Sequence, residues 1–283
     1  MIVVTGATGN VGRTLVRLLA DAGETVTAVS RKITQADVPA GVRAVAADMA
    51  AEPLPFEGAE ALYLLISGDY IGAVASPREA IAELLADAKA AGVRRVVLQS
   101  SQGVATRPES FSHGALGLAV EEAVIASGLD WTILRPGGFA SNAFAWSEQV
   151  RRQRAVAAPF GDVGLPIIDP DDIAAVGAVA LLESGHAGEI YELTGPVVST
   201  PRERAAAIGA ALGETVRFEE QTREEARAQM VVFMPEPVAD TTLAIIGTPR
   251  EGERRVSGDV ERVLGRAGQP FEAWAARNVG AFR

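Results

Sequence analysis

The sequence predicts an α/β protein, a doubly wound parallel sheet followed by a small mixed lobe, on three observations. Apolar runs rich in β-branched residues alternate with helical segments through the first half of the chain. The first of these runs, 1–5, ends in a glycine turn that leads directly into an amphipathic segment at 13–22. Beyond residue 138 the alternation breaks down. Strands separated by helices form parallel sheets through right-handed crossovers, so a sheet with helices on both faces is expected.

Five further strands are expected in the first half of the chain, at 24–29, 42–46, 61–66, 93–98 and 131–134. The run at 61–66 is almost wholly apolar, which is typical of a strand that is covered on both faces. A helix is predicted to begin at Ser76, because this serine is followed by a proline and, three residues on, by a glutamate. It ends at Gly92, and another helix is expected from 116 to 128.

The later part of the chain predicts shorter and more varied elements. An irregular or helical segment, a loop, a short extended piece, a helix and a strand are expected in turn at 139–154, 159–165, 166–169, 170–182 and 189–193. Thr200 and Thr222 each precede a glutamate by three residues, the pattern of a capping box that opens a short helix. A small strand is expected between them, at 216–219.

The composition narrows the classes of function. Hydrophobic residues make up 48% of the chain and charged ones 22%, which is typical of an ordered globular protein. No apolar run approaches the roughly 20 residues that cross a membrane, and a net charge of −10 argues against a nucleic-acid surface. The chain has no cysteine, which excludes disulfides and thiolate metal sites. Because a strand begins at once without a basic segment, we expect no signal peptide and a cytoplasmic location.

The glycine turn is the strongest functional motif. It reads Gly6-Ala7-Thr8-Gly9-Asn10-Val11-Gly12, with glycines at the spacing G-x-x-G-x-x-G. Three glycines at this spacing allow a tight turn, close approach to a pyrophosphate and packing of the helix on the strand. The helix N-terminus offers N–H groups and partial positive charge to the phosphates. The motif therefore predicts dinucleotide binding by these residues, and a plain tight turn is the alternative.

The end of the second strand predicts which dinucleotide binds. A carboxylate usually follows the glycines by about 20 residues and holds the ribose hydroxyls of NAD. This chain has Ser30, Arg31 and Lys32 there instead, groups that suit the 2′-phosphate of NADPH. The alternative is that Arg31 and Lys32 are ordinary surface charges in a turn. Asp48 follows the third strand and is expected to accept a hydrogen bond from the adenine amino group, unless it only closes a turn.

Residues after the fourth, fifth and sixth strands are expected to meet the ribose and the nicotinamide. They are Ile66, Ser67, Ser100, Pro136, Gly138 and Phe139. Two glycines before Phe139 permit close approach of a flat ring, and the phenyl ring either forms a wall of the pocket or belongs to the core. Ser101 is a weak catalytic candidate, because a serine hydroxyl equally often closes a turn. We therefore expect a Rossmann-type NAD(P)-binding domain over 1–153, and the remaining sheet elements with a substrate-covering lobe over 154–283.

Several segments together resemble the NmrA-like branch of the atypical short-chain dehydrogenase/reductase family. The matching segments are 5–12, 90–97, 127–139 with Asn142, and 169–174. The resemblance covers most of the chain up to about residue 194 and is weaker beyond. It implies an NADPH-dependent reductase of quinones or azo dyes, or else a catalytically silent protein that binds the dinucleotide and reports redox state to a transcription factor.

The chain departs from the wider family in its catalytic residues. The family pattern is a tyrosine with a lysine four residues on, and the lysine lowers the pKa of the tyrosine so that it transfers a proton. The chain has only two lysines, Lys32 and Lys89, and neither follows a tyrosine at that spacing. His113 stands near the expected place of the tyrosine; it is a weak proton-donor candidate, with a structural role as the alternative. Glu121 and Glu122 are expected on the helix surface.

These observations favour an NADPH-dependent reductase of an electrophilic small molecule, with a quinone as the leading acceptor. A reduced quinone is a stabilised phenolate that water protonates, so the absence of the tyrosine and lysine is compatible with this chemistry. The alternative is the catalytically silent NADP-binding redox sensor that acts on a partner protein. The expected partners are a small-molecule substrate and either a second copy of the chain or a regulatory protein, with no nucleic acid, no membrane and no metal.

Overall fold

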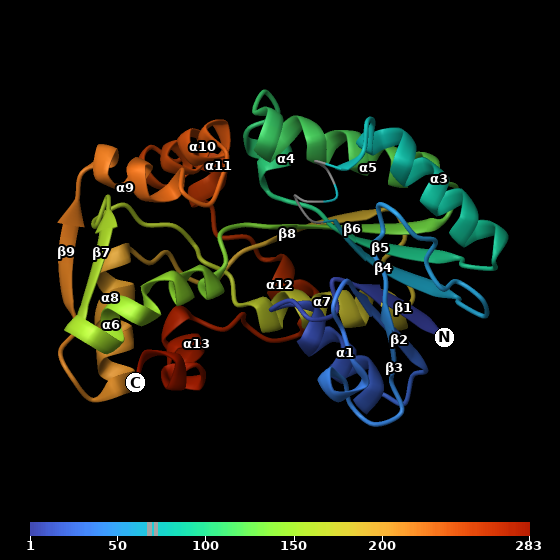
Figure 1. Ribbon diagram of the computed structural model, residues 1–283, viewed down its shortest axis with the longest axis horizontal. Helices are drawn as coiled ribbons and strands as arrows, with labels where there is room; N and C mark the ends of the chain where they lie inside the picture. The colour runs from blue at the N-terminus through green and yellow to red at the C-terminus, as the bar shows by residue number, and fades with distance from the viewer. Residues whose placement is uncertain (67–69, 71–72) are drawn as a thin grey trace.

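A seven-stranded parallel sheet forms the centre of the computed structural model, which describes residues 1–66, 70 and 73–283 (Figure 1). Its strands are β1 (Ile2–Thr5), β2 (Val26–Ser30), β3 (Arg43–Ala46), β4 (Ala61–Leu65), β5 (Arg95–Gln99), β6 (Asp130–Pro136) and β8 (Glu189–Leu193). The spatial order is β3-β2-β1-β4-β5-β6-β8, so the chain reverses direction of winding between β1 and β4. The predicted Rossmann-type sheet is confirmed, and its topological switch point lies beside the glycine turn.

Helices cover both faces of this sheet. On one face, α1 (Gly12–Asp21) and α7 (Pro170–Leu182) bury an apolar stripe, and α3 (Pro77–Ala90) and α5 (Leu116–Ala126) do so on the other (Figure 1). Thr14 Oγ1 of α1 donates a 2.7 Å hydrogen bond to Asp171 Oδ1 at the start of α7. The expected start of α3 is confirmed, because Ser76 caps the helix and Pro77 occupies its first position. The switch point is thus held between two well-packed layers.

The connection from β5 to α5 contains two short helices that the sequence did not predict. These are α4 (Gly103–Thr106) and a π-helical turn, η2 (Phe111–Ala115), which runs into α5. Arg107 lies between them, almost fully buried, and forms a bidentate ion pair with Glu253 at 2.6 and 2.9 Å. Gln102 Nε2 also donates to Gly252 O at 3.1 Å. The loop after β5 is therefore tied to the C-terminal part of the chain.

The later part of the chain builds a second, two-stranded parallel sheet from β7 (Ala155–Pro159) and β9 (Arg217–Gln221). The strand expected at 216–219 is confirmed as β9, whereas β7 was missed. Besides α7, the helical elements of this part are η3 (Ala140–Trp146), α6 (Ser147–Gln153), α8 (Pro201–Leu212), α9 (Arg223–Met230), α10 (Glu236–Gly247), α11 (Glu251–Arg254), α12 (Asp259–Leu264), α13 (Phe271–Arg277) and η4 (Val279–Phe282). Both predicted capping boxes are present, at Thr200 with Glu203 and at Thr222 with Glu225.

A separate apolar core supports this lobe. Trp274 of α13 packs edge-on against Phe144 with ring centres 4.9 Å apart, and it also contacts Phe271 and Phe282. Figure 1 shows α6, α8 and α13 gathered beside β7 and β9, while α9, α10 and α11 lie above them, with α11 on the side toward α4. Among the described residues, no helix combines the length and the apolar character that a bilayer crossing requires.

Candidate dinucleotide-binding site

At the two ends of the glycine turn, Gly6 and Gly12, no residue other than glycine fits. Gly6 has a positive φ of 64°, and a Cβ added to it would lie 2.9 Å from Leu65 Cδ2. A Cβ added to Gly12 would lie 2.2 Å from Gly6 O, so α1 begins in direct contact with the end of β1. Arg13, which the sequence did not single out, braces the turn by donating to Thr8 O at 3.1 Å and to Gly9 O at 3.3 Å. This geometry presents the N-terminus of α1 at the edge of the sheet.

A cavity of about 140 Å³ opens beside the turn, at the carboxyl ends of β1, β2, β3 and β4. Gly6, Ser30, Arg31 and Asp48, four of the predicted cofactor residues, line it. Ser30 Oγ lies 2.9 Å from Thr8 Oγ1, which joins the end of β2 to the glycine turn. Ligands of open α/β sheets bind at this edge, and the cavity with its rim of polar groups suits the adenosine end of a dinucleotide.

The other predicted residues of this half are distributed around the same edge. Lys32 follows Arg31 in the exposed turn after β2, and Ile66 directly follows β4. Ser67 lies outside the residues that the structure describes. Asn10 is exposed in the turn, whereas the Val11 side chain is buried in the core and leaves only its backbone for a ligand. Asp48 Oδ1 accepts a 3.0 Å hydrogen bond from Ala50 N, so this carboxylate also closes its own turn.

Three polar side chains form a buried cluster beneath the ends of β5 and β6. Glu121 of α5 is 1% exposed, and its Oε1 accepts from Ser100 Oγ at 2.5 Å and from Arg135 Nε at 3.0 Å. Arg135 Nη2 donates to the other carboxylate oxygen at 2.5 Å. The expectation that Glu121 is a surface residue is wrong, because α5 turns it inward toward β6. The Ser100 hydroxyl is engaged with Glu121, and its backbone N–H donates to Leu134 O at 2.8 Å.

The two catalytic candidates make contacts within the protein. Ser101 Oγ accepts from Gly103 N at 3.1 Å at the start of α4. His113 Nδ1 lies 2.8 Å from Ser112 Oγ, and Nε2 lies 3.4 Å from Thr242 Oγ1 of α10. Burial lowers the pKa of His113 below its usual range, and the nearby charge of Arg107 lowers it further. The imidazole is therefore predominantly neutral at pH 7. Its contact with Thr242 connects η2 to α10.

The end of β6 presents the predicted pair of glycines. Gly137 N donates to Leu193 O at 2.9 Å, which holds this segment against β8. Gly138 is exposed, and a Cβ added to it would lie 3.0 Å from Ile167 Cδ1. Pro136 is buried beneath them, and Phe139 packs partly into the core beside Ile168. Of the two glycines, Gly138 is therefore the one that exposes its backbone at this edge of the sheet.

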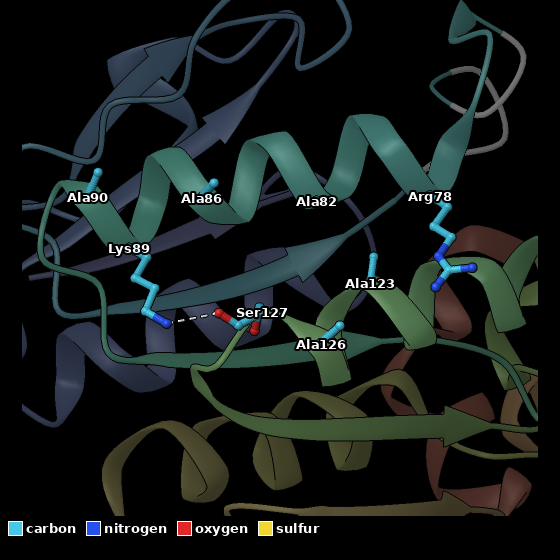
Figure 2. Close-up of a pocket in the computed structure, with 8 residues that line it drawn as sticks. All are labelled: Arg78, Ala82, Ala86, Lys89, Ala90, Ala123, Ala126 and Ser127. Atoms are coloured by element: carbon cyan, nitrogen blue, oxygen red, sulfur yellow. Dashed lines mark hydrogen bonds between the residues drawn. The ribbon is translucent and has the colours of Figure 1, made fainter.

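A larger groove of about 600 Å³ lies elsewhere, between α3 and α5 (Figure 2). Five alanines of the two helices form most of its walls, and Lys89 reaches across it to donate to Ser127 O at 3.1 Å. Arg78 at its other end is paired with Glu122 at 3.2 Å. The groove lies in the helical layer, away from the carboxyl ends of the strands. The smaller cavity at the switch point is therefore the candidate dinucleotide site.

The glycine turn and the cavity beside it suit a dinucleotide. A comparison with protein families agrees with this interpretation. Residues 6–183 match a family described as NAD(P)H-binding, which spans the glycine turn, the cavity and the glycine pair after β6. The chain belongs to this NAD(P)H-binding family. No group of three or more metal-binding side chains occurs within the part of the chain that the structure describes.

Two relatives match along essentially the whole chain. A (4-alkanoyl-5-oxo-2,5-dihydrofuran-3-yl)methyl phosphate reductase of Streptomyces griseus is 35% identical, over 100% of this chain and 99% of its own length. An NAD(P)H azoreductase of Xenophilus azovorans is 31% identical over the same shares. Both relatives are named as reductases, and the second as one that uses NAD(P)H. The sequence's expectation of an NAD(P)H-binding protein related to reductases is confirmed.

Solved structures share its fold at lower identity. An NADPH-dependent quinone oxidoreductase of Escherichia coli, solved with NADPH, superposes with a TM-score of 0.78 at 23% identity over 98% of this chain and 99% of that one. NmrA, a negative transcriptional regulator, superposes with a TM-score of 0.73 at 18% identity over 99% of this chain and 95% of that one. Both likenesses show a shared fold, which agrees with the fold that the resemblance to the NmrA-like branch implied.

The Glu121–Arg135 pair predicts a large loss of stability when the carboxylate is removed. Glu121→Ala leaves the partly buried Arg135 guanidinium without its partner, which should lower the free energy of unfolding by about 3 kcal/mol. Urea denaturation measures the effect. Glu122→Ala is the matched control, because its exposed pair with Arg78 should contribute less than about 1 kcal/mol. Equal losses in the two variants would show that Glu121 does not stabilise the ends of β5 and β6.

The glycine turn predicts a binding defect without unfolding. A Cβ at Gly9 would lie 3.2 Å from Gly6 O and project from an exposed turn, so Gly9→Val should fold. Its branched side chain would occupy the pyrophosphate position and remove charge-assisted hydrogen bonds, weakening NADPH binding by at least about a hundredfold. Calorimetry measures the affinity, with Gly258→Val as the control because nothing lies within 4 Å of a Cβ there. Unchanged affinity in a folded Gly9 variant would place the cofactor elsewhere.

Proposed function

We propose that the protein is an NADPH-dependent reductase of conjugated electrophiles, with quinones as the leading acceptors. The observation that carries the proposal is the glycine turn with its adjacent cavity at the switch point. It occurs in a chain whose sequence has no lysine four residues after a tyrosine. When bound, the nicotinamide supplies the hydride. Acceptors whose hydride adduct is a stabilised anion need no side-chain acid, because water protonates the anion. Quinones meet this condition, and so do butenolides of the kind that the Streptomyces relative reduces.

Each part of the proposed site has a distinct task. The N-terminus of α1 and the glycine turn bind the pyrophosphate, and Ser30, Arg31 and Lys32 bind the 2′-phosphate. Asp48 accepts from the adenine amino group. The backbone of Gly137 and Gly138 admits the nicotinamide ring, and Phe139 supports it. The protein then contributes proximity and orientation of two flat rings, which are large terms in the rate of a bimolecular reaction.

A catalytically silent redox sensor is the second candidate. The shared fold with NmrA, a negative transcriptional regulator, favours it, as does the missing tyrosine–lysine pair. The experiment that separates the two follows NADPH oxidation with quinones, azo dyes, butenolides and simple ketones. Turnover of the conjugated acceptors but not of ketones supports the reductase. Tight binding of NADP in both redox states without any turnover would overturn it in favour of the sensor.

The basic residues after β2 predict a preference for NADPH over NADH. Arg31 lines the cavity, and a bidentate contact with the 2′-phosphate contributes roughly 1.5–3 kcal/mol. Arg31→Ala should therefore weaken NADPH binding at least about tenfold and leave the affinity for NADH unchanged. Calorimetry with both cofactors measures this, and Arg17→Ala on the exposed side of α1 serves as the control. Equal wild-type affinities for the two cofactors would contradict the prediction.

The surroundings of His113 predict that it is not an essential acid. Its lowered pKa leaves the ring neutral near pH 7, and both ring nitrogens already face hydroxyl groups. His113→Ala should therefore reduce quinone turnover by much less than the roughly hundredfold that a positioned acid contributes at minimum. The pH–rate profile of the wild type should show no inflection below about pH 6.5, where the lowered pKa of His113 would place one. A hundredfold loss with intact NADPH affinity would instead make His113 the proton donor and reopen ketones as substrates.

A further inference from the structure

Arg204 is a partly buried arginine whose guanidinium forms no ion pair with the carboxylates that the structure describes. It lies in the first turns of α8, on the side that also carries the buried Ala205 and Ile208. Its Nε donates to Thr200 O at 3.3 Å. Within the described part of the chain no carboxylate forms an ion pair with it, whereas its neighbour Arg202 is paired with Asp162 at 2.9 Å. Burial lowers the pKa of Arg204 to about 10, and the nearby charge of Glu203 opposes this shift only in part.

The nearby acidic and backbone groups are already used. The Glu203 carboxylate accepts from Thr200 N at 2.8 Å and from Thr200 Oγ1 at 3.0 Å in the capping box. At the start of α8, Arg202 N donates to Gly161 O, and Glu203 N donates to Thr200 Oγ1. At the start of α8, the terminal Nη groups of Arg204 are therefore the donors that remain for a ligand. A cation removed from water is costly unless an anion pairs with it.

Trp146 connects Arg204 to the candidate active site. The guanidinium lies over its ring, with Cζ 5.6 Å from the ring centre, within the range of a cation–π contact. Trp146 is the last residue of η3, which begins directly after Gly138 and Phe139. A seven-residue helix of this type is about 14 Å long. Arg204 and the glycine pair thus lie at opposite ends of one short element, and the exposed Asn142 lies between them.

We propose that Arg204 binds a phosphate monoester carried by the acceptor, at the end of the acceptor away from its reducible ring. A planar guanidinium with free Nη groups matches two phosphate oxygens through parallel hydrogen bonds. The phosphate supplies the counter-charge that the described residues do not provide. This inference rests on the proposed reductase function and narrows its substrates to anionic conjugated carbonyls.

The reaction that follows is a conjugate reduction. The hydride adds to the carbon β to the carbonyl group, and the electron pair of the carbon–carbon double bond moves to form an enolate. Water gives a proton to the α-carbon, and NADPH leaves as NADP⁺. The phosphate takes no part in the bond changes, so Arg204 contributes to acceptor binding and orientation.

Steady-state kinetics with a matched pair of acceptors tests the inference. The pair is a hydroxymethyl butenolide and its phosphate monoester, each assayed at saturating NADPH. The wild type should have at least about a tenfold lower KM for the phosphate ester. Arg204→Met should remove this preference through KM, while calorimetry shows NADPH affinity as in the wild type. Arg202→Met is the control, because Arg202 is exposed and already paired, and it should retain the preference.

Further outcomes separate this inference from the proposed function. Inorganic phosphate should compete with the phosphate ester, but not with NADPH, and only in proteins that retain Arg204. If Arg204→Met does not fold, Arg204→Lys keeps the charge without the planar fork and should lose most of the preference. An Arg204 variant that affects both acceptors equally would overturn the phosphate site while leaving the reductase intact. Absence of turnover with every acceptor would overturn the reductase, and calorimetry of the phosphate ester with the NADP-saturated protein would then still test Arg204.

Discussion

The absence of a side chain at Gly12 is the constraint on which the dinucleotide site depends. An added Cβ would lie 2.2 Å from Gly6 O and 2.8 Å from Ala7 Cα, both backbone atoms that cannot yield without moving β1. The helix α1 therefore starts against the end of its strand, where the order of the sheet reverses. The same contact places Thr8 within hydrogen-bonding distance of Ser30, so the turn and the rim of the cavity form one continuous surface.

Buried ion pairs fix the loops that surround this surface. The Glu121–Arg135 pair holds α5 against the end of β6, and the Arg107–Glu253 pair holds the loop after β5 against α11. Removing one member of such a pair leaves an uncompensated charge. The main role of these pairs is therefore to specify which segments of the chain meet, and their net contribution to stability is smaller. They explain why a site on loops, which are usually mobile, can be well ordered around the place expected for the nicotinamide.

The N-terminal half was predictable because its signals are local. Most of its strands are short apolar runs, and the glycine turn and Ser76 mark the starts of α1 and α3, whereas α4 and α5 begin without a capping side chain. The later elements carry weaker signals: β7 reads Ala-Val-Ala-Ala-Pro, which has no alternation. The burial of Glu121 was not predictable, because its partner lies on β6 and meets it only when α5 packs on the sheet. Arg13 was missed for a similar reason, since its two carbonyl acceptors face it only once the turn has formed.

The same distinction between local and tertiary signals bears on substrate choice. The cofactor half of the site follows from a local motif, whereas Arg204 becomes informative only when the fold shows that its neighbours' carboxylates are engaged elsewhere. Under the proposed function, the protein has no side-chain acid with which to discriminate among acceptors, so selection must come from the electronic nature of the acceptor and from its charge. Arg31 and Arg204 would then bind two phosphates, Arg31 the one on the cofactor and Arg204 the one on the acceptor. Both lie away from the reacting atoms, where binding energy orients the two rings without entering the bond changes.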